Sequence, residues 1–379
     1  MKNELLNKKL KICFVSLSSY PLLKGINLGY VGGAEAQQIL LAKELRKRGY
    51  EISFITYGEE NKNIEIADNI KIVPAYERNN SKKLHFFRKA FYIMRKMKNI
   101  NADIYFYRAG SPGIVSISCK LLQKKLIHMI SSDAVVTGEA IIKNDLLSIF
   151  LGKMAHFFDI KLSDKVVAQN KFQKSKLKER FNMDGIIIKN SLDISLHLNK
   201  KYIGDYLLWI GTIRSIKQPE LFLKIAQHFP EHKFVMIGGK GESSELFKKI
   251  KNAAERIQNV EFKGFVPPQE IYTYYQKAIL LINTSRIEGF PNIFLEAWSC
   301  SIPVISLNVD PDGIISKYKL GSHSKTFDQL LNDIKTLLKD KELLEIMGKN
   351  GRKYVEENHD IKKIADQYEN LIESLVKNG

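Results

Sequence analysis

Two carboxylates, Glu288 and Glu296, stand eight positions apart in the segment of this sequence best suited to chemistry. The apolar run 278–282 before them predicts a buried strand, and residues 293–298 have a helical pattern. Glu288 therefore falls on a strand-to-helix loop, and Glu296 lies in the first turns of a helix whose unpaired N–H groups form an anion site. The amides suit a diphosphate and the carboxylates suit sugar hydroxyls, so the segment predicts a nucleotide-sugar site.

The loop after a second predicted strand, 206–210, carries two cations, Arg214 and Lys217. An arginine fork and a lysine point charge can together clamp a diphosphate. The alternative is that both are ordinary solvated surface cations, which contribute little.

Glycines mark two further loops. Gly32 and Gly33 precede a helix predicted over 34–48, and glycine there lets the backbone approach an anion closely. The alternative is a tight turn without a ligand. The G-x-G-x-x-G pattern is absent from this loop, which disfavours a nicotinamide enzyme. Gly239 lies in a second glycine-rich turn after a predicted strand.

The elements that must position these residues alternate between strand and helix in both halves of a 379-residue chain, which is long enough for two domains. This alternation predicts parallel sheets covered by helices on both faces. The polar stretch 190–205 indicates a linker, and 361–376 indicates a last helix. The predicted strands are 10–17, 52–56, 103–107, 125–130, 165–168, 185–188, 206–210, 233–237, 260–262, 279–282 and 304–306.

The positive charge is concentrated in the first half. Residues 1–190 hold 33 Lys and Arg against 17 Asp and Glu, a net of +16 out of +18 for the chain. Such a half suits an anionic partner: nucleic acid, an anionic membrane or a phosphorylated substrate. No helix-turn-helix, zinc or RNP-like string supports nucleic-acid binding. No apolar run approaches the ~20 residues of a membrane-spanning helix, and we see no signal peptide.

Residues 82–98 hold seven basic residues interleaved with aromatic ones. At helical spacing Phe87, Phe91, Met94 and Met97 share one face. This segment predicts either a helix resting on an anionic bilayer or a core-packed helix with a solvated basic face. The three cysteines lie in apolar contexts without metal-like spacing, which favours small core residues in a cytoplasmic protein.

The segment from Glu288 to Glu296, with the helix and Pro-Val-led strand after it, resembles the glutamate-seven-residues-glutamate motif of retaining glycosyltransferases of family 4. The resemblance implies the GT-B fold, an α/β architecture of two facing Rossmann-like domains with a C-terminal helix crossing back to the first. The implied boundaries are 1–195 for an acceptor-side domain, 196–358 for a nucleotide-sugar domain and 359–379 for that helix.

The resemblance also implies roles for single residues. Glu288 contacts the donor sugar near the reacting centre, and Glu296 accepts bonds from the ribose hydroxyls. Lys217 matches the family's lysine, whereas Thr212 stands at the arginine position and Arg214 lies two residues on. The remaining donor-binding positions are Gly32, Gly33, Gly239, Val266, Gly289, Phe290, Pro291 and Asn292.

On the acceptor side, Asp133 follows a predicted strand, where a polar group can face a cleft, and we expect it to act in catalysis. Arg108 ends another strand and could also face the acceptor. His128 lies within an apolar run and is better explained as a core histidine. Ser301 stands where the family usually has glycine at a helix end.

We therefore expect a retaining glycosyltransferase that moves a sugar from a UDP- or GDP-linked donor to a lipid-linked or cell-surface polysaccharide acceptor. It would work in the cytoplasm at the inner face of the membrane, without a cofactor or metal and without nucleic acid. The Asp310-Pro311-Asp312 string imitates a metal motif, but a turn explains it better. The alternatives are an epimerase with the same fold, a nucleic-acid-binding protein, and a catalytically degenerate donor-binding scaffold.

Overall fold

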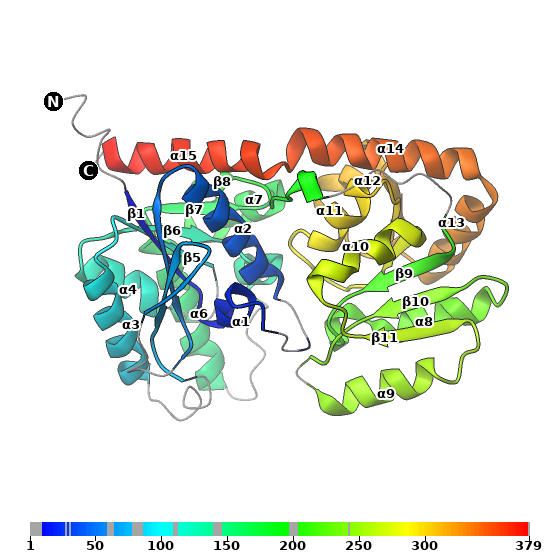
Figure 1. The fold of residues 1–379 in the computed structure, drawn as a ribbon, viewed down its shortest axis with the longest axis horizontal. Helices are drawn as coiled ribbons and strands as arrows, with labels where there is room; N and C mark the ends of the chain where they lie inside the picture. The colour runs from blue at the N-terminus through cyan, green and yellow to red at the C-terminus, as the bar shows by residue number, and fades with distance from the viewer. Residues whose placement is uncertain are drawn as a thin grey trace. The chain divides into compact units, whose positions relative to one another are not determined.

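The computed structural model describes residues 10–26, 29, 32–58, 64–77, 86–108, 113–138, 146–196, 204–241 and 243–377. The chain forms two compact units, each built on its own sheet (Figure 1). The first unit contains 32–191, the strand before it and the segment from Ile361 onward, and the second contains Leu192–Asp360.

The first unit has a sheet in the order β3-β4-β2-β1-β5-β6-β7-β8. Every pair in it is parallel except β3 with β4. Its strands are β1 (Lys11–Val15), β2 (Glu51–Thr56), β3 (Glu65–Ala67), β4 (Ile70–Pro74), β5 (Ile104–Tyr107), β6 (Lys125–Met129), β7 (Lys165–Ala168) and β8 (Ile186–Ile187).

Both faces of this sheet are buried, because the central strands are apolar on both sides. On one face Phe14 stacks between Phe54 and Phe106, with ring centroids 5.0 and 4.8 Å away. Cys13, Val15 and Tyr105 belong to the core of the other face. The helices of this unit are α1 (Tyr20–Leu23), α2 (Gly33–Lys47), α3 (Phe86–Ile100), α4 (Ile114–Leu121), α5 (Asp133–Thr137), α6 (Leu146–Lys161), α7 (Lys171–Phe181) and α15 (Ile361–Lys377).

The last helix, α15, belongs to the first unit, as the fold class predicts. It packs beside α2, and Tyr368 lies 5.8 Å from the Phe106 ring. Arg48, at the end of α2, binds Asp366 at 2.6 Å and Glu369 at 2.5 Å, and it donates to the carbonyl of Lys362.

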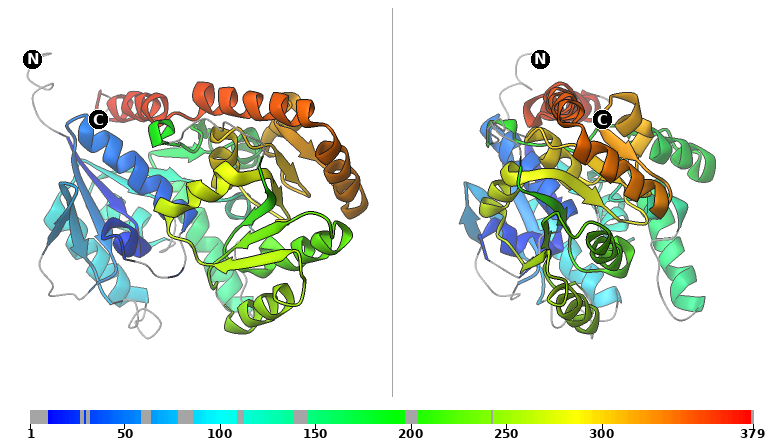
Figure 2. Two further views of the ribbon diagram at one scale, coloured as in Figure 1. Left: turned by 45° about the vertical axis from the view of Figure 1, so that its right-hand side comes forward. Right: turned by 90° about the vertical axis from the view of Figure 1, so that its right-hand side faces the viewer.

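The second unit has an all-parallel sheet in the order β11-β10-β9-β12-β13-β14. The strands are β9 (Tyr206–Ile210), β10 (Phe234–Ile237), β11 (Val260–Gly264), β12 (Ala278–Asn283), β13 (Val304–Ser306) and β14 (Gly321–His323). The helices are α8 (Pro219–His228), α9 (Ser244–Ala254), α10 (Pro268–Lys277), α11 (Asn292–Ser299), α12 (Ile314–Lys317), α13 (Phe327–Lys339) and α14 (Lys341–Asn358). Figure 2 shows both units from two further sides.

Helix α11 is held by close packing against α14. Trp298 is fully buried and donates its indole N–H to the carbonyl of Leu320 at 3.1 Å. A side chain at Gly351 would collide with the Trp298 ring, and one at Gly348 would collide with the backbone of Ser301. This packing fixes the helix that carries Glu296.

Candidate functional site

Two loops of the second unit, 211–218 and 284–291, follow β9 and β12, which are neighbouring parallel strands. The carboxyl ends of neighbouring parallel strands share one edge of a sheet, where open α/β sheets bind their ligands. The two loops are joined through the backbone, because Arg286 N–H donates to the carbonyl of Ile216 at 2.8 Å.

The side chains of Lys217 and Glu288 form an ion pair between these loops. Lys217 ends the short 3-10 helix η4 (Ser215–Lys217), and its side chain is 24% exposed against 16% for Glu288. The structure therefore joins the two residues that the sequence placed at the reacting end of a donor, although they lie far apart in the chain.

Thr284 positions Lys217 from beneath. Its side chain is fully buried, its hydroxyl donates to the Lys217 carbonyl at 2.7 Å, and it accepts from the indole N–H of Trp209 at 3.0 Å. Sequence reasoning missed Thr284, since its only local signal is a hydroxyl directly after an apolar strand.

A buried polar network continues below the Glu288 loop. The Asn283 amide donates to Ser285 Oγ at 3.2 Å and accepts from Ser306 Oγ at 3.3 Å. Asn308 donates to the Ser285 carbonyl at 3.2 Å. Partnered polar groups inside a protein hold one conformation, because each would be costly to leave unpaired. The loop that carries Glu288 is thus fixed from β12 and β13 together.

The glycine-rich turn after β10 packs directly on the Lys217 loop. Ile213 N–H donates to the Gly239 carbonyl at 3.0 Å, and Gly238 N–H donates to the Gly264 carbonyl at 2.8 Å. A side chain at Gly238 would collide with the Gly211 carbonyl. The exposed Arg214 lies against Gly241 on the same surface.

Glu296 is half-buried beside the phenol rings of Tyr272 and Tyr275. Its carboxylate accepts from the hydroxyl of the fully buried Tyr275 at 2.7 Å. Burial raises the pKa of Glu296, and the Tyr275 hydrogen bond offsets part of this rise. Burial and the nearby Glu296 charge both raise the pKa of Tyr272. Tyr275 holds one carboxylate oxygen in place, and residue types alone did not indicate this contact.

The segment between the glutamates turns into α11. Pro291 occupies the N-cap position, and Phe290 is 7% exposed with its ring 5.0 Å from that of His359. Gly289 is buried, whereas Asn292 is half-buried at the first helical position. Val266 follows β11, half-buried against the core beneath α11.

In the first unit, Gly32 is the N-cap of α2 and Gly33 its first residue. A side chain at Gly32 would collide with the carboxylate of Glu35, which folds over the helix start. Asp133 begins α5 and accepts from Gln173 at 2.8 Å and from Asn170 at 3.3 Å. One of its oxygens therefore serves to join α5 to α7.

Arg108 and His128 are both buried at the ends of strands in the first unit. Arg108 is 5% exposed and donates to Asn190 at 3.0 Å, and burial lowers the pKa of its guanidinium. His128 is 2% exposed and packs its ring edge-on against Tyr107 at 5.3 Å. Burial lowers the pKa of His128 to about 4, so it is a neutral core residue near pH 7.

Asp310 caps the 3-10 turn η5 (Pro311–Gly313) and accepts from Ile315 N–H at 2.9 Å. Asp312, two residues on, has a φ of 55°, as in a tight turn. Among the residues that the structure describes, no cluster of three or more His, Cys, Asp or Glu side chains is placed to hold a metal ion.

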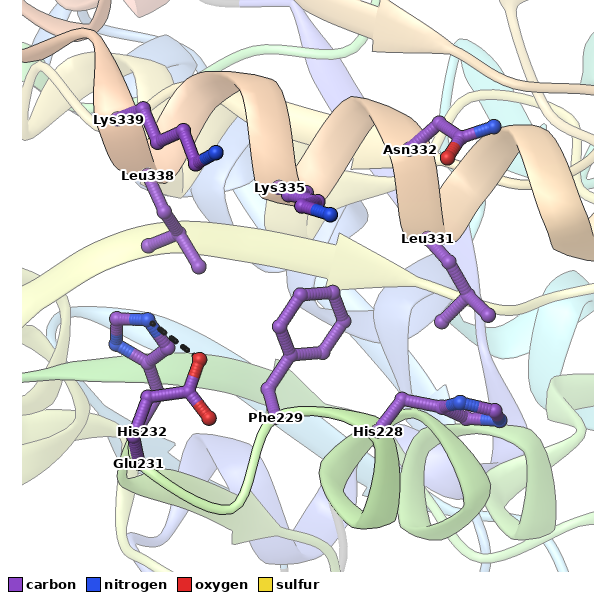
Figure 3. Close-up of a pocket in the computed structure, with 9 residues that line it drawn as sticks. All are labelled: His228, Phe229, Glu231, His232, Leu331, Asn332, Lys335, Leu338 and Lys339. Carbon is purple, nitrogen blue, oxygen red and sulfur yellow. Dashed lines mark ion pairs between the residues drawn. The ribbon is translucent and has the colours of Figure 1, made fainter.

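A cavity of about 420 Å³ lies elsewhere in the second unit, between the end of α8 and α13 (Figure 3). Phe229, Leu331 and Leu338 line it, with His228, His232, Lys335 and Lys339 also on its wall. His232 lies 3.5 Å from Glu231. None of the residues predicted for the donor site lines this cavity.

Two family models match consecutive parts of the chain. The model described as Glycosyltransferase Family 4 matches residues 31–196, and the model described as Glycosyl transferases group 1 matches residues 197–354. The chain belongs to the group 1, family 4 glycosyltransferases. The second model covers Lys217, Glu288 and Glu296 together, and the first covers Gly32, Gly33 and Asp133.

The glycosyltransferase is similar to three proteins of known sequence or structure. An uncharacterized glycosyltransferase of Haemophilus influenzae is 22% identical over 92% of this chain and 98% of its own length. A Campylobacter jejuni enzyme, named as an α-1,4-N-acetylgalactosaminyltransferase acting on a diNAcBac-PP-undecaprenol-linked glycan, is 24% identical over 70% of this chain and 73% of its own. The Anabaena protein HepE, solved with UDP-glucose, is 15% identical and superposes with a TM-score of 0.73 over 96% of this chain and all of that one.

The structural likeness confirms the predicted fold class, GT-B. In the described part of the glycosyltransferase, no helix combines the length and the apolar character needed to cross a membrane.

Proposed function

We propose that this glycosyltransferase takes a sugar from a nucleotide-sugar donor, with retention of configuration, and that the donor binds at the carboxyl edge of β9, β10 and β12. The observation that carries the proposal is the Lys217–Glu288 pair, a cation and a carboxylate on two neighbouring loops, with the Lys217 backbone held by the buried Thr284 hydroxyl. The donor's diphosphate binds the ammonium group of Lys217 in place of Glu288. The Glu288 carboxylate can then accept a hydrogen bond from a sugar hydroxyl.

The second carboxylate, Glu296, receives the ribose hydroxyls while Tyr275 holds its other side. In the reaction the bond from the anomeric carbon to the diphosphate breaks, a bond from that carbon to the acceptor oxygen forms, and the proton of the acceptor hydroxyl passes to the leaving diphosphate. Negative charge grows on the leaving diphosphate, where Lys217, Arg214 and the start of α11 stabilise it. These groups supply the charge compensation for a reaction without a metal or other cofactor. UDP is the donor nucleotide to test first, since HepE was solved with UDP-glucose.

We place the acceptor among lipid-linked or cell-surface polysaccharide precursors, at the inner face of the membrane. Support comes from the name of the Campylobacter relative, whose acceptor is carried on undecaprenyl diphosphate, and from the basic first half of the chain. It also comes from α3, where Phe87 and Phe91 are 81% and 55% exposed while Met97 is buried. Phe87 and Phe91 thus lie outside the core and suit contact with an anionic bilayer; residues 82–85 lie outside the described residues.

A panel of UDP- and GDP-sugars, scored for slow donor hydrolysis and then for transfer, tests this function. We expect turnover with at least one donor, loss of that turnover in Glu288→Ala with folding unchanged, and no inhibition by EDTA. Wild-type turnover in Glu288→Ala would remove Glu288 from the site. Strong inhibition by EDTA would instead support a metal at Asp310 and Asp312.

The same panel separates the competing functions. Donor affinity without hydrolysis or transfer would identify a degenerate scaffold, and interconversion of two nucleotide sugars would identify an epimerase. Tight, steeply salt-dependent binding of plain DNA or RNA without sugar turnover would identify a nucleic-acid-binding protein.

A further inference from the structure

Helix α6 exposes several large apolar side chains. Phe150, Met154, Phe157 and Phe158 follow one another at helical spacing, and they are 60%, 38%, 39% and 38% exposed. We call these four residues the α6 stripe. A helix on a globular protein normally turns such a stripe toward the core. Here the stripe is exposed to solvent, and a contiguous exposed apolar stripe is typical of a surface that binds another apolar surface.

The inner side of α6 shows that this orientation is fixed. Asp159 is fully buried and accepts from Gly113 N–H at 2.9 Å and from Ser116 Oγ at 2.8 Å, which joins α6 to the start of α4. A side chain at Gly113 would meet Ala155 at 3.4 Å, so the helices are in close contact there. Ile160 belongs to the core of the unit. Rotating the α6 stripe inward would expose these contacts.

The charges beside the α6 stripe indicate what covers it. Helix α7 contacts α6, and the ring of Phe157 lies 6.1 Å from that of Phe181 at the end of α7. Lys171, Lys174, Lys178 and Arg180 of α7 are exposed. The single acid of α7, Glu179, is paired with Lys176, and Lys178 is paired with Asp184 just after the helix. On α6 itself Lys153 and Lys161 are exposed, whereas its single acid is the buried Asp159.

We propose that the α6 stripe inserts into the interface of an anionic bilayer, with the lysines of α7 lying against the lipid headgroups. Apolar side chains bordered by cations form the pattern of an interfacial helix. A second copy of this chain would bring like charges together, which costs free energy. The proposed function, transfer to a lipid-linked or cell-surface acceptor, explains why the enzyme would bind a membrane, and the proposal rests on it for that reason alone. Helix α6 lies outside the segment 82–98 for which the sequence analysis considered membrane contact.

Flotation with vesicles tests the α6 stripe directly, using the full-length chain. Vesicles of phosphatidylcholine alone are compared with vesicles that also contain phosphatidylglycerol. We expect stronger binding to the anionic vesicles, weakening as salt is added. Phe150→Glu should weaken this binding about tenfold or more, since it places a charge in the apolar layer. Ile346→Glu is the matched control, because Ile346 is 44% exposed on α14 of the other unit, and we expect it to bind as the wild type does.

A second pair of variants tests the charges. Lys171→Glu with Lys174→Glu should weaken binding to anionic vesicles about tenfold or more, at about 1 kcal/mol for each basic residue near the surface. Lys335→Glu with Lys339→Glu, two exposed lysines of α13, should not. Phe150→Trp adds a fluorescent reporter. Trp209 and Trp298 are 2% and 0% exposed, so a blue shift with vesicles and quenching by brominated lipid would come from position 150.

Several outcomes would overturn the proposal. These are no vesicle binding by the wild type, equal binding by Phe150→Glu and the wild type, and no spectral change in Phe150→Trp. Concentration-dependent dimers that Phe150→Glu abolishes, without vesicle binding, would assign the α6 stripe to a second copy of this chain. Binding to RNA rather than to vesicles would assign it to nucleic acid. Donor hydrolysis in solution is measured separately, so failure of the proposed function would leave the vesicle result standing.

Discussion

Lys217 and Glu288 neutralise each other where the proposed donor's diphosphate binds. Ligand and carboxylate therefore compete for one ammonium group, and donor binding both fills the site and releases the carboxylate. The roles of the two residues can therefore be separated by experiment. Lys217 binds the diphosphate, whereas Glu288 competes with the diphosphate for Lys217.

Lys217→Ala should weaken UDP-sugar binding by about 1.5–3 kcal/mol, the range for a hydrogen bond to a charged group. Isothermal titration measures this loss. Lys335→Ala is the control, because Lys335 is an exposed lysine of α13 outside the proposed donor site. Unchanged affinity in Lys217→Ala would contradict the role of Lys217 in binding the diphosphate.

Glu288→Gln should retain or improve UDP affinity while turnover is lost, because Lys217 is then free for the diphosphate.

Asp159 connects a single carboxyl group to the pH dependence of stability. Burial raises its pKa from 3.8 to about 7. A raised pKa means that the folded state holds the proton more tightly than the unfolded state. Protonated Asp159 therefore contributes to the free energy of unfolding in full below pH 4, and this contribution is lost as the pH rises through 7. Asp159→Asn should remove this loss, so the wild type should fall relative to the variant between pH 4 and pH 7. Urea unfolding across that range measures the difference, and parallel curves would contradict it.

The sequence was enough to single out Lys217 and Glu288, which are charged residues on loops after predicted strands, and Glu296 in the first turns of the helix that follows. The pairing of Lys217 with Glu288 was not predictable, since it depends on β9 and β12 being neighbours. Thr284 and Tyr275 were missed for a related reason. Each acts through a hydrogen bond to a residue on another element, and neither has a local pattern.

At the scale of elements, the residue after the C-terminal end of α11 has a strained backbone conformation. Ser301 has a φ of 57°, in the left-handed region where glycine is favoured, and its N–H donates to the Trp298 carbonyl at 2.9 Å. The sequence has a serine where the family usually has glycine. In the structure this serine adopts a backbone conformation that glycine adopts at lower cost.

Ser301→Gly should stabilise the protein by about 0.5–1 kcal/mol. It relieves a left-handed conformation that costs about 1–2 kcal/mol for a side-chain-bearing residue, less the extra freedom glycine gains when unfolded. Thermal unfolding of the second unit measures this. Ser299→Gly is a control in the last turn of α11, where glycine should destabilise; a lower midpoint for Ser301→Gly would refute the assignment.

Elements with strong apolar runs were predictable, and β9 and β13 match the predicted ranges. Strand β14 was not predictable, because Gly321-Ser322-His323 contains no apolar residue and pairs only through β13. Strands β3 and β4 were missed as well; β4 ends in a proline, which interrupts the strand pattern. The exposure of the α6 stripe was also not predictable, because an apolar helix sequence does not show which of its residues face the core.

At the scale of the whole molecule, the first unit is built from segments far apart in the chain. Its core includes Ile12 and Phe14 of β1 together with Ile364, Tyr368 and Ile372 of α15. The second unit consists mostly of one continuous stretch, Leu192–Asp360. The two units should therefore respond differently to loss of the end of the chain.

Truncation after Asp360 should unfold or strongly destabilise the first unit while the second stays folded. Each large apolar side chain removed from the core forfeits about 1.5–3 kcal/mol, and several are lost from a unit with a stability of about 5–15 kcal/mol. Limited proteolysis with mass mapping distinguishes the two units. Truncation after Lys377 leaves α15 whole and is the control, and equal protection of both units after the longer truncation would contradict this expectation.

The placement of α15 also sets an order for biosynthesis. A ribosome releases β1, β2 and β5 long before Ile361 leaves its exit tunnel, so the nascent first unit displays the Phe14 face without the helix that closes it. The second unit meets no such delay, because its strands and helices emerge together. Chaperones that bind nascent chains should therefore bind the first unit. They should release it only after α15, a helix of seventeen residues, has packed against it.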